Sequence, residues 1–235
     1  MSLGRFGSSA PVLPGVSGFT GGSAMEEARD NLNPSPEGMP ALSPQLAQLL
    51  AAYGGNLIVL GSFESWSAGT TSAPDGWTLT GAGATIARNT TASQLQDGLA
   101  SVSVTAALNT ATDLAQSITV STTQNLRLRG REVTFSARVR AGTADRVFLR
   151  LDDGVVTKDS RYHVGDSAFE TLAVTMTVDA AATKIEASCE IASGASITAQ
   201  FDAAKLEEGA QATAFTPNPR DAFAQPRALT STTAQ

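Results

Sequence analysis

The stretch NLIVLGSFESWSAGTTSAPDGW, from Asn56 to Trp77, decides how the rest of this sequence is interpreted. It holds both tryptophans of the 235-residue chain, together with Phe63, a short apolar run and two glycine turns. Large aromatic side chains either fill a core or are presented to a ligand, and burial of each is worth about 2 kcal/mol or more. We predict that Phe63, Trp66 and Trp77 are structural residues that close one end of a sheet domain.

Downstream of this stretch the hydrophobic pattern has a period of two. Seven segments alternate apolar and polar residues without intervening helical patterns, and turn sequences separate them. The segments are 100–107, 116–121, 132–141, 146–151, 170–178, 183–192 and 196–206. The opening stretch is expected to add two or three further strands. This pattern predicts a mainly β protein, an antiparallel β-sandwich of the jelly-roll type over residues 56–219.

Upstream, residues 1–55 read as an extended N-terminal arm. Residues 1–22 are rich in Gly, Ser and Pro, and short helices are predicted after Ser23 and after Ser43. The second helix would present an apolar face made of Leu46, Leu49, Leu50 and Tyr53. Such an arm has no core of its own, so we expect it to dock on a partner surface; the alternative is a leader that merely covers one end of the domain. Residues 220–235 form a C-terminal tail.

Composition limits the partners. The formal net charge is −6 without a dense Lys/Arg cluster, which argues against nucleic-acid binding. No apolar run has the length of a membrane span, and the N-terminus lacks the apolar core of a secretory leader, so we expect a soluble protein made in the cytoplasm. The single cysteine, Cys189, has no disulfide partner in the chain and fits a buried apolar position.

Two segments resemble a known family. NLIVLGSFESW…GW, at 56–77, resembles the opening of β-jelly rolls of the carbohydrate-binding-module type. FDAAKLEEGAQATAFTPNP, at 201–219, is similar to the closing strand and exit loop of such domains in bacteriophage tail and fibre proteins. The resemblance covers about residues 56–219, with specific motifs only at its two ends. It implies a jelly-roll domain in a virion structural protein.

The same resemblance implies a structural calcium ion held by Glu64 and Asp202. Hard carboxylate oxygens suit calcium, but two carboxylates need additional carbonyl ligands that a sequence does not show. The alternative is that both carboxylates accept hydrogen bonds and tie the chain ends together.

Catalysis is not expected. His163 is the only histidine, and the chain contains no HExxH, GxSxG or P-loop motif. Adjacent acidic pairs such as Asp152-Asp153 read as turn residues and do not suggest a glycosidase.

The best candidate for a surface glycan site is a polar loop with one aromatic residue. Its members are Lys158, Asp159, Arg161, Tyr162 and His163. Sugars are recognised by flat rings and converging polar groups, and the alternative is an ordinary solvated loop. A second idea is a basic stripe made of Arg127, Arg129, Arg131, Arg138, Arg140 and Arg150.

These observations leave three classes of function. The first, which we favour, is a virion structural protein: a tail, fibre or decoration component that docks through its arm, contacts other virion proteins, and adheres weakly to cell-surface polysaccharide. By analogy with fibres it would be a homo-oligomer, with a trimer favoured. The second is a free glycan-binding module, and the third is an accessory domain of a hydrolase.

Overall fold

The computed structural model describes residues 55–120, 125–218 and 220–221, all within one compact unit, Gln48–Gln235. The predicted helices of the arm, including Leu46, Leu49, Leu50 and Tyr53, lie outside the described residues, as does the tail beyond Asp221. What the structure shows is the predicted sandwich domain.

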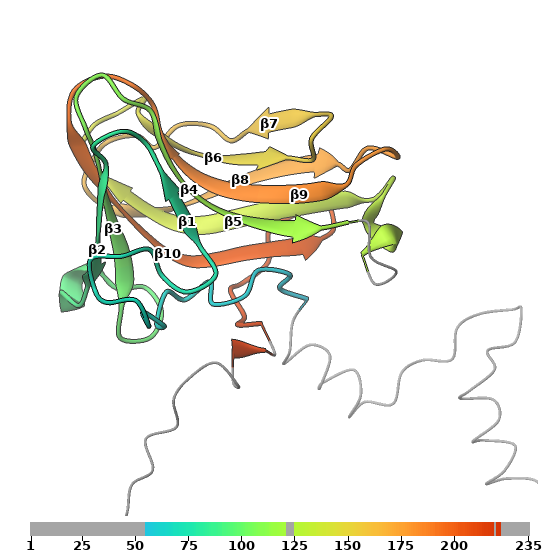
Figure 1. Ribbon diagram of the computed structural model, residues 1–235, viewed down its shortest axis with the longest axis horizontal. Helices are drawn as coiled ribbons and strands as arrows, with labels where there is room; N and C mark the ends of the chain where they lie inside the picture. The colour runs from blue at the N-terminus through green and yellow to red at the C-terminus, as the bar shows by residue number, and fades with distance from the viewer. Residues whose placement is uncertain (1–54, 121–124, 219, 222–235) are drawn as a thin grey trace, which may run out of the picture. The chain divides into compact units, whose positions relative to one another are not determined.

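Within these residues, ten strands form two five-stranded sheets in which all neighbouring strands are antiparallel (Figure 1). In sheet A the strand order is β1 (Thr78–Thr80), β4 (Thr112–Thr119), β9 (Lys184–Ile191), β6 (Val147–Asp152) and β7 (Thr157–Asp159). In sheet B it is β2 (Thr85–Asn89), β3 (Ser101–Ala106), β10 (Ile197–Glu208), β5 (Glu132–Ala141) and β8 (Phe169–Thr177). The short 3-10 helices are η1 (Ala92–Gln94) and η2 (Leu126–Leu128).

The predicted antiparallel β-sandwich is confirmed, and each of the seven alternating segments overlaps a strand. The opening stretch differs from its prediction. Described residues 56–77 contain no strand, and β1 begins only at Thr78. Leu60 and Phe63 have φ angles of 58° and 55°, in the left-handed region, so the backbone cannot run on as an extended strand there. The stretch is a series of turns that crosses one end of the sandwich.

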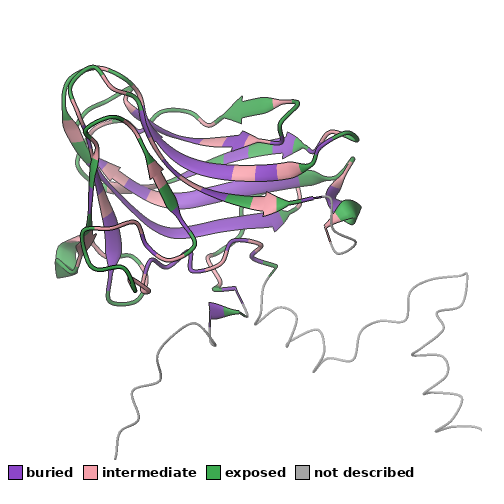
Figure 2. Ribbon diagram, in the orientation of Figure 1, coloured by how far each residue is buried: buried purple, intermediate pink, exposed green. Residues whose placement is uncertain are grey.

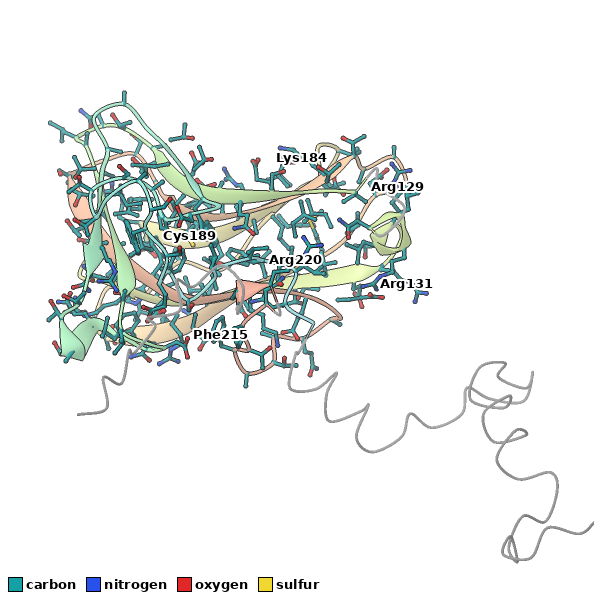
Figure 3. The ribbon with its side chains drawn as sticks, turned by 60° about the horizontal axis from the view of Figure 1, so that its bottom comes forward. Arg129, Arg131, Lys184, Cys189, Phe215 and Arg220 are labelled. Atoms are coloured by element: carbon teal, nitrogen blue, oxygen red, sulfur yellow. The ribbon has the colours of Figure 1, made fainter. Side chains whose placement is uncertain are left out.

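The core lies between the two sheets and follows the period of two (Figure 2). On β5, Val133, Phe135, Ala137 and Val139 are buried in it. Arg138 and Arg140 on the opposite side of the strand are only partly buried. Cys189 on β9 is also in the core (Figure 3), and burial raises the pKa of its thiol well above the ordinary value, so it stays an apolar thiol.

Aromatic residues of the opening stretch pack against this core. The rings of Phe63 and Trp77 are 4.9 Å apart between centroids, and both side chains are buried. Trp66 is partly buried and donates from Nε1 to the carbonyl of Phe63 at 2.6 Å. The three residues therefore belong to the body of the domain.

A glycine and a bulge let the opening stretch approach sheet B. The β10–β5 register shifts between Asp202 and Lys205, and Ala203 in this bulge has a φ of 50°. Ala204 donates its N–H to the carbonyl of Gly61 at 2.8 Å. A Cβ on Gly61 would lie 2.0 Å from the carbonyl oxygen of Ala204, so only glycine fits at this crossing.

Side-chain amides join the two ends of the domain. Asn56 donates from Nδ2 to the carbonyls of Ala204 and Thr216, and its Oδ1 accepts from the N–H groups of Ile58 and Leu206. From the other end, Asn218 donates to the carbonyl of Asn56 at 2.7 Å. Asp221 accepts from the N–H of Leu60 at 2.7 Å and from that of Asn218 at 2.9 Å. We call Asn56, Phe63, Trp77, Asn218 and Asp221 the closing end.

Candidate functional site

The outer face of sheet A gathers charged and aromatic side chains around β6. Val147, Leu149 and Leu151 point into the core, so the alternate residues Phe148, Arg150 and Asp152 belong to the outer side. In the register, Phe148 lies opposite Glu190 of β9, and Arg150 lies between Ser188 of β9 and Asp159 of β7. Neighbouring strands thus place complementary groups side by side.

Arg150 is the centre of this group. Its Nε and Nη2 donate to the two carboxylate oxygens of Asp159 at 2.7 and 3.0 Å. This bidentate ion pair fixes both side chains. Nη1 lies 3.7 Å from Glu190, and the guanidinium carbon lies 5.2 Å from the centroid of the Phe148 ring. We call Phe148, Arg150, Asp159, Tyr162 and Glu190 the Arg150 cluster.

Tyr162 gives the cluster an exposed aromatic ring. Its side chain is 43% exposed, and its ring meets that of Phe148 edge-on at 5.0 Å between centroids. Phe148 is only 5% exposed although it lies on the outer side, because its neighbours cover it. The tyrosine ring is therefore held against a fixed support while much of its surface faces solvent.

Two acids on this face, Glu190 and Asp113, are less acidic than usual. Burial raises the pKa of Glu190, and the negative charges of Asp113 and Asp159 add to that effect, while Ser188 and Arg150 oppose it. Burial also raises the pKa of Asp113 on β4, with the charge of Glu186 as the next cause. The pKa of Arg150 is raised, chiefly by its hydrogen bond to Asp159. The face is an array of hydrogen-bonding groups in which Arg150 is held among acids.

The structure brings together only part of the predicted glycan loop. Asp159 and Tyr162 are in the Arg150 cluster. Lys158 is paired with core-facing Leu151 in the register, so it belongs to the opposite side of β7 from Asp159. Arg161 bonds to Glu170 of β8 and to the carbonyl of Tyr162, away from Asp159.

His163 does not belong to a surface glycan site as predicted, because its side chain is fully buried and cannot contact a surface ligand. Its Nδ1 accepts from the N–H of Gly165 at 2.8 Å, so Nε2 carries the proton and donates to the carbonyl of Ala168 at 3.1 Å. This histidine holds the loop together from inside.

Sequence reasoning missed Phe148, Arg150 and Glu190 as site residues. The sequence placed Arg150 in a basic stripe and gave no sign that Phe148 and Glu190 lie beside it. The strand parity of 146–151 carried the missing information, because a strand with Val147, Leu149 and Leu151 inward must turn Phe148 and Arg150 outward. The stripe is not continuous: Arg138 and Arg140 are on β5 in sheet B, whereas Arg150 is in sheet A.

Glu64 and Asp202, the predicted calcium ligands, both hold the loop at 95–100. Asp202 is fully buried and accepts from the N–H groups of Gln96 at 2.7 Å, Asp97 at 3.1 Å and Ala203 at 2.7 Å. Glu64 accepts from the N–H groups of Leu99 at 2.5 Å and Ala100 at 2.9 Å. Both carboxylates thus accept hydrogen bonds, as in the alternative, but these bonds fix the loop at 95–100 and do not join the chain ends to each other.

The surroundings of the Glu64 and Asp202 carboxylates do not fit a bound cation. N–H groups point at the carboxylate oxygens that an ion would need, and Arg88 lies 3.6 Å from Glu64. In the described part of the chain, no group of three or more His, Cys, Asp or Glu residues is placed to hold a metal ion. Calcium binding remains a prediction to be tested directly.

The pKa values of two acids at this loop, Asp202 and Asp97, are raised. Burial raises the pKa of Asp202 to about 6, against the opposing effect of three backbone hydrogen bonds, and the charge of Asp97 adds to the rise. Burial and then the charge of Glu64 raise the pKa of Asp97. Asp97 thus lies within electrostatic range of both carboxylates.

No helix in the residues that the structure describes is long and apolar enough to cross a membrane.

Comparisons with known proteins give a fold and no family. No protein-family model matches the chain, and no curated protein matches its sequence. Among solved structures, the enzymatically active domain of bacteriophage CBA120 tailspike protein 4 is 15% identical over 66% of this chain and 21% of its own, with a TM-score of 0.49. A xylan-binding domain of carbohydrate-binding-module family 22 is 16% identical over 68% of this chain and 99% of its own, also with a TM-score of 0.49.

A third solved structure, a cyclase from Fischerella sp. TAU, is 12% identical over 68% of this chain and 99% of its own, with a TM-score of 0.50. At such low identity the likeness concerns the β-sandwich fold alone.

Proposed function

We propose that this chain is a virion structural protein whose sandwich domain binds carbohydrate on the outer face of sheet A. The observation that carries the carbohydrate part is Tyr162, a half-exposed ring supported by Phe148 beside a fixed Arg150–Asp159 pair. A sugar ring stacks its C–H face on an aromatic ring, and its hydroxyls bond to carboxylates and hydroxyls in the same plane.

Pre-organisation supports this site. Arg150 contacts Asp159, Glu190 and the Phe148 ring at once, so none of these side chains needs to be ordered when a ligand arrives. Ser188, which donates to Glu190 at 2.7 Å, extends the row of polar groups across β9. With a single exposed ring, the expected affinity is weak per copy, and repeated copies would raise it by avidity.

The virion part of the proposal rests on the sequence. The closing segment 201–219 resembles the exit of domains found in phage tail and fibre proteins, and the arm 1–55 supplies a docking segment with Leu46, Leu49, Leu50 and Tyr53 as its apolar face. The strand order, in which each sheet takes strands from both halves of the domain, supports a jelly roll of that type. Other virion proteins would be the partners of the arm, in a homo-oligomer.

Binding is tested with the full chain on a glycan array, followed by titration of the strongest polysaccharide hit. Tyr162→Ala should weaken binding at least about fivefold, because stacking of this kind contributes about 1 kcal/mol or more. Val164→Ala, an exposed residue of the same loop, is the matched control and should bind like the wild type. A chain that binds no glycan, or a Tyr162→Ala variant with unchanged affinity, would refute the proposed face.

The virion part has its own test. Mass spectrometry of purified phage particles should find the full chain in a fixed number of copies. If the protein binds glycans but is absent from particles, it is a free glycan-binding module.

A further inference from the structure

Strand β4 has an edge that its neighbour does not cover. On one side β4 pairs with β9 along its whole length, from Thr112 to Thr119. On the other side the three residues of β1 pair only with Asp113, Leu114 and Ala115. Residues 116–119 therefore form an open edge in sheet A.

The free backbone groups of this edge can be assigned from the ladder. Val120 donates its N–H to the carbonyl of Thr183 at 2.8 Å, so alternate residues such as Ile118 bond to β9, and Ser117 and Thr119 point their N–H and C=O groups the other way. Asn125 donates from Nδ2 to the carbonyl of Thr119 at 2.8 Å. In the described residues, the N–H and C=O of Ser117 and the N–H of Thr119 have no partner.

A cavity of about 550 Å³ lies along this edge. A second part of its wall includes Leu57, Val59 and Gly76. Gln116 fixes that wall, because its side-chain amide accepts from the N–H of Val59 at 2.8 Å and donates to the carbonyls of Val59 and Gly76 at 2.9 and 3.1 Å. The space is bordered by a free strand edge on one side and a fixed wall on the other, which suits an added strand.

Both ends of the domain reach this cavity. Asn56 lines it, and so does Arg220, which is labelled in Figure 3. Asp221, the last described residue, is held by Leu60 and Asn218 and directly follows Arg220. Seven further residues of extended chain would span about 23 Å and reach residue 228.

The sequence shows which undescribed segment, the N-terminal arm or the C-terminal tail, is better suited to form a strand. Residues 228–233, ALTSTT, contain neither Pro nor Gly, and three of the six are Thr. Residues 1–22 are interrupted by Gly and Pro, which weaken strands, and residues 43–53 follow a helical period. The tail is the segment suited to a strand.

We propose that residues 228–233 of the tail bind in this cavity as an added strand of sheet A, bonded to the free groups of Ser117 and Thr119. Exposed edge strands are a liability in solution, and pairing removes it. Ser117 and Thr119 would face serine and threonine side chains of the tail. The domain already uses such cross-strand pairs, since the hydroxyls of Thr105 and Thr198 are 2.7 Å apart and those of Thr134 and Thr175 are 2.8 Å apart.

Hydrogen exchange followed by NMR tests the proposal on the full chain. The amides of Ser117 and Thr119 should exchange at least about 100-fold more slowly in the full chain than in a chain ending at Asp221. The amide of Val139 in β5 is the internal control and should not change. A peptide of residues 227–235, added to the shortened chain, should restore the protection.

Ser117→Pro gives a second readout. Proline removes the N–H on the open edge and leaves the β9 ladder intact, because that ladder uses Gln116 and Ile118. The variant should lose the protection of Thr119, whereas Ser117→Ala, which keeps the N–H, should retain it.

Three results would overturn the proposal: fast exchange of both amides in the full chain, loss of protection only when residues 1–54 are removed, or protection that grows with protein concentration. The second would assign the edge to the arm, and the third to a second copy of the chain.

Discussion

The closing end and the Arg150 cluster use polar groups in opposite ways. At the closing end, buried side-chain amides bond to backbone groups around the Phe63–Trp77 pair, and little of this reaches solvent. In the Arg150 cluster, charged side chains bond to one another and a tyrosine ring remains half exposed. Buried backbone groups must be bonded or stability is lost, whereas exposed ion pairs contribute little. The first region should therefore control folding and the second recognition.

The largest effect is expected for Trp77→Ala. Truncating this buried ring removes its contact with Phe63 and leaves a cavity, which should cost about 3–5 kcal/mol of unfolding free energy. Urea unfolding followed by circular dichroism measures the loss. Trp66→Ala is the control and should cost less, since Trp66 is only partly buried. A Trp77→Ala chain that stays as stable as the wild type and loses only sugar binding would reverse the roles of the two regions.

Asn56→Ala should come next. The change deprives the carbonyls of Ala204 and Thr216 and the N–H groups of Ile58 and Leu206 of their partner. We expect a loss of about 2–4 kcal/mol, because unpaired buried groups keep their full desolvation cost. Asn89→Ala, which removes a part-buried amide on β2, should cost about 1 kcal/mol or less. Equal losses for both variants would show that the closing end has no special weight.

A smaller, pH-dependent effect is expected at Asp202. Its pKa in the folded chain is about 6, above the ordinary 3.8, so the folded state binds the proton more tightly than the unfolded state. Stability from this group is therefore present at low pH and is lost as the pH rises through the interval between these values. Relative to Asp202→Asn, the wild type should lose unfolding free energy from pH 4 to pH 6.

Asp75→Asn provides a control of opposite sign. Hydrogen bonds from Ser65 and then Ser67 lower the pKa of Asp75, so its contribution is present above the ordinary pKa and is lost on acidification. A flat difference between wild type and Asp202→Asn across pH 4 to 6 would contradict the raised pKa.

The smallest effect is expected from calcium. Since N–H groups already engage Glu64 and Asp202, the melting temperature should be the same in EDTA and in millimolar calcium. Scanning calorimetry of the full chain measures this, with magnesium as the control ion. A rise of several degrees with calcium alone, lost in the Asp202→Asn variant, would restore the predicted metal site.

The two regions also differ in how far the sequence predicts them. Alternation within 132–141 and the other segments was enough to place the strands and the core, because only one parity buries Val133, Phe135 and Val139. The left-handed turns at Leu60 and Phe63 were not predictable, since these residue types seldom adopt them. The Arg150–Asp159 pair depends on the β6–β7 register, which the sequence leaves open. His163 lies in a loop without a period, so nothing in the sequence indicated its burial.

The bond between Asn218 and Asn56 has a consequence for engineering. Because these residues, 162 positions apart, are joined directly, the two ends of the domain lie beside each other. A short linker could therefore connect them, and new termini could be opened at the exposed turn between β6 and β7, near Gly154. A circular permutant of this kind would keep both sheets, and the domain could equally be inserted whole into a surface loop of another protein.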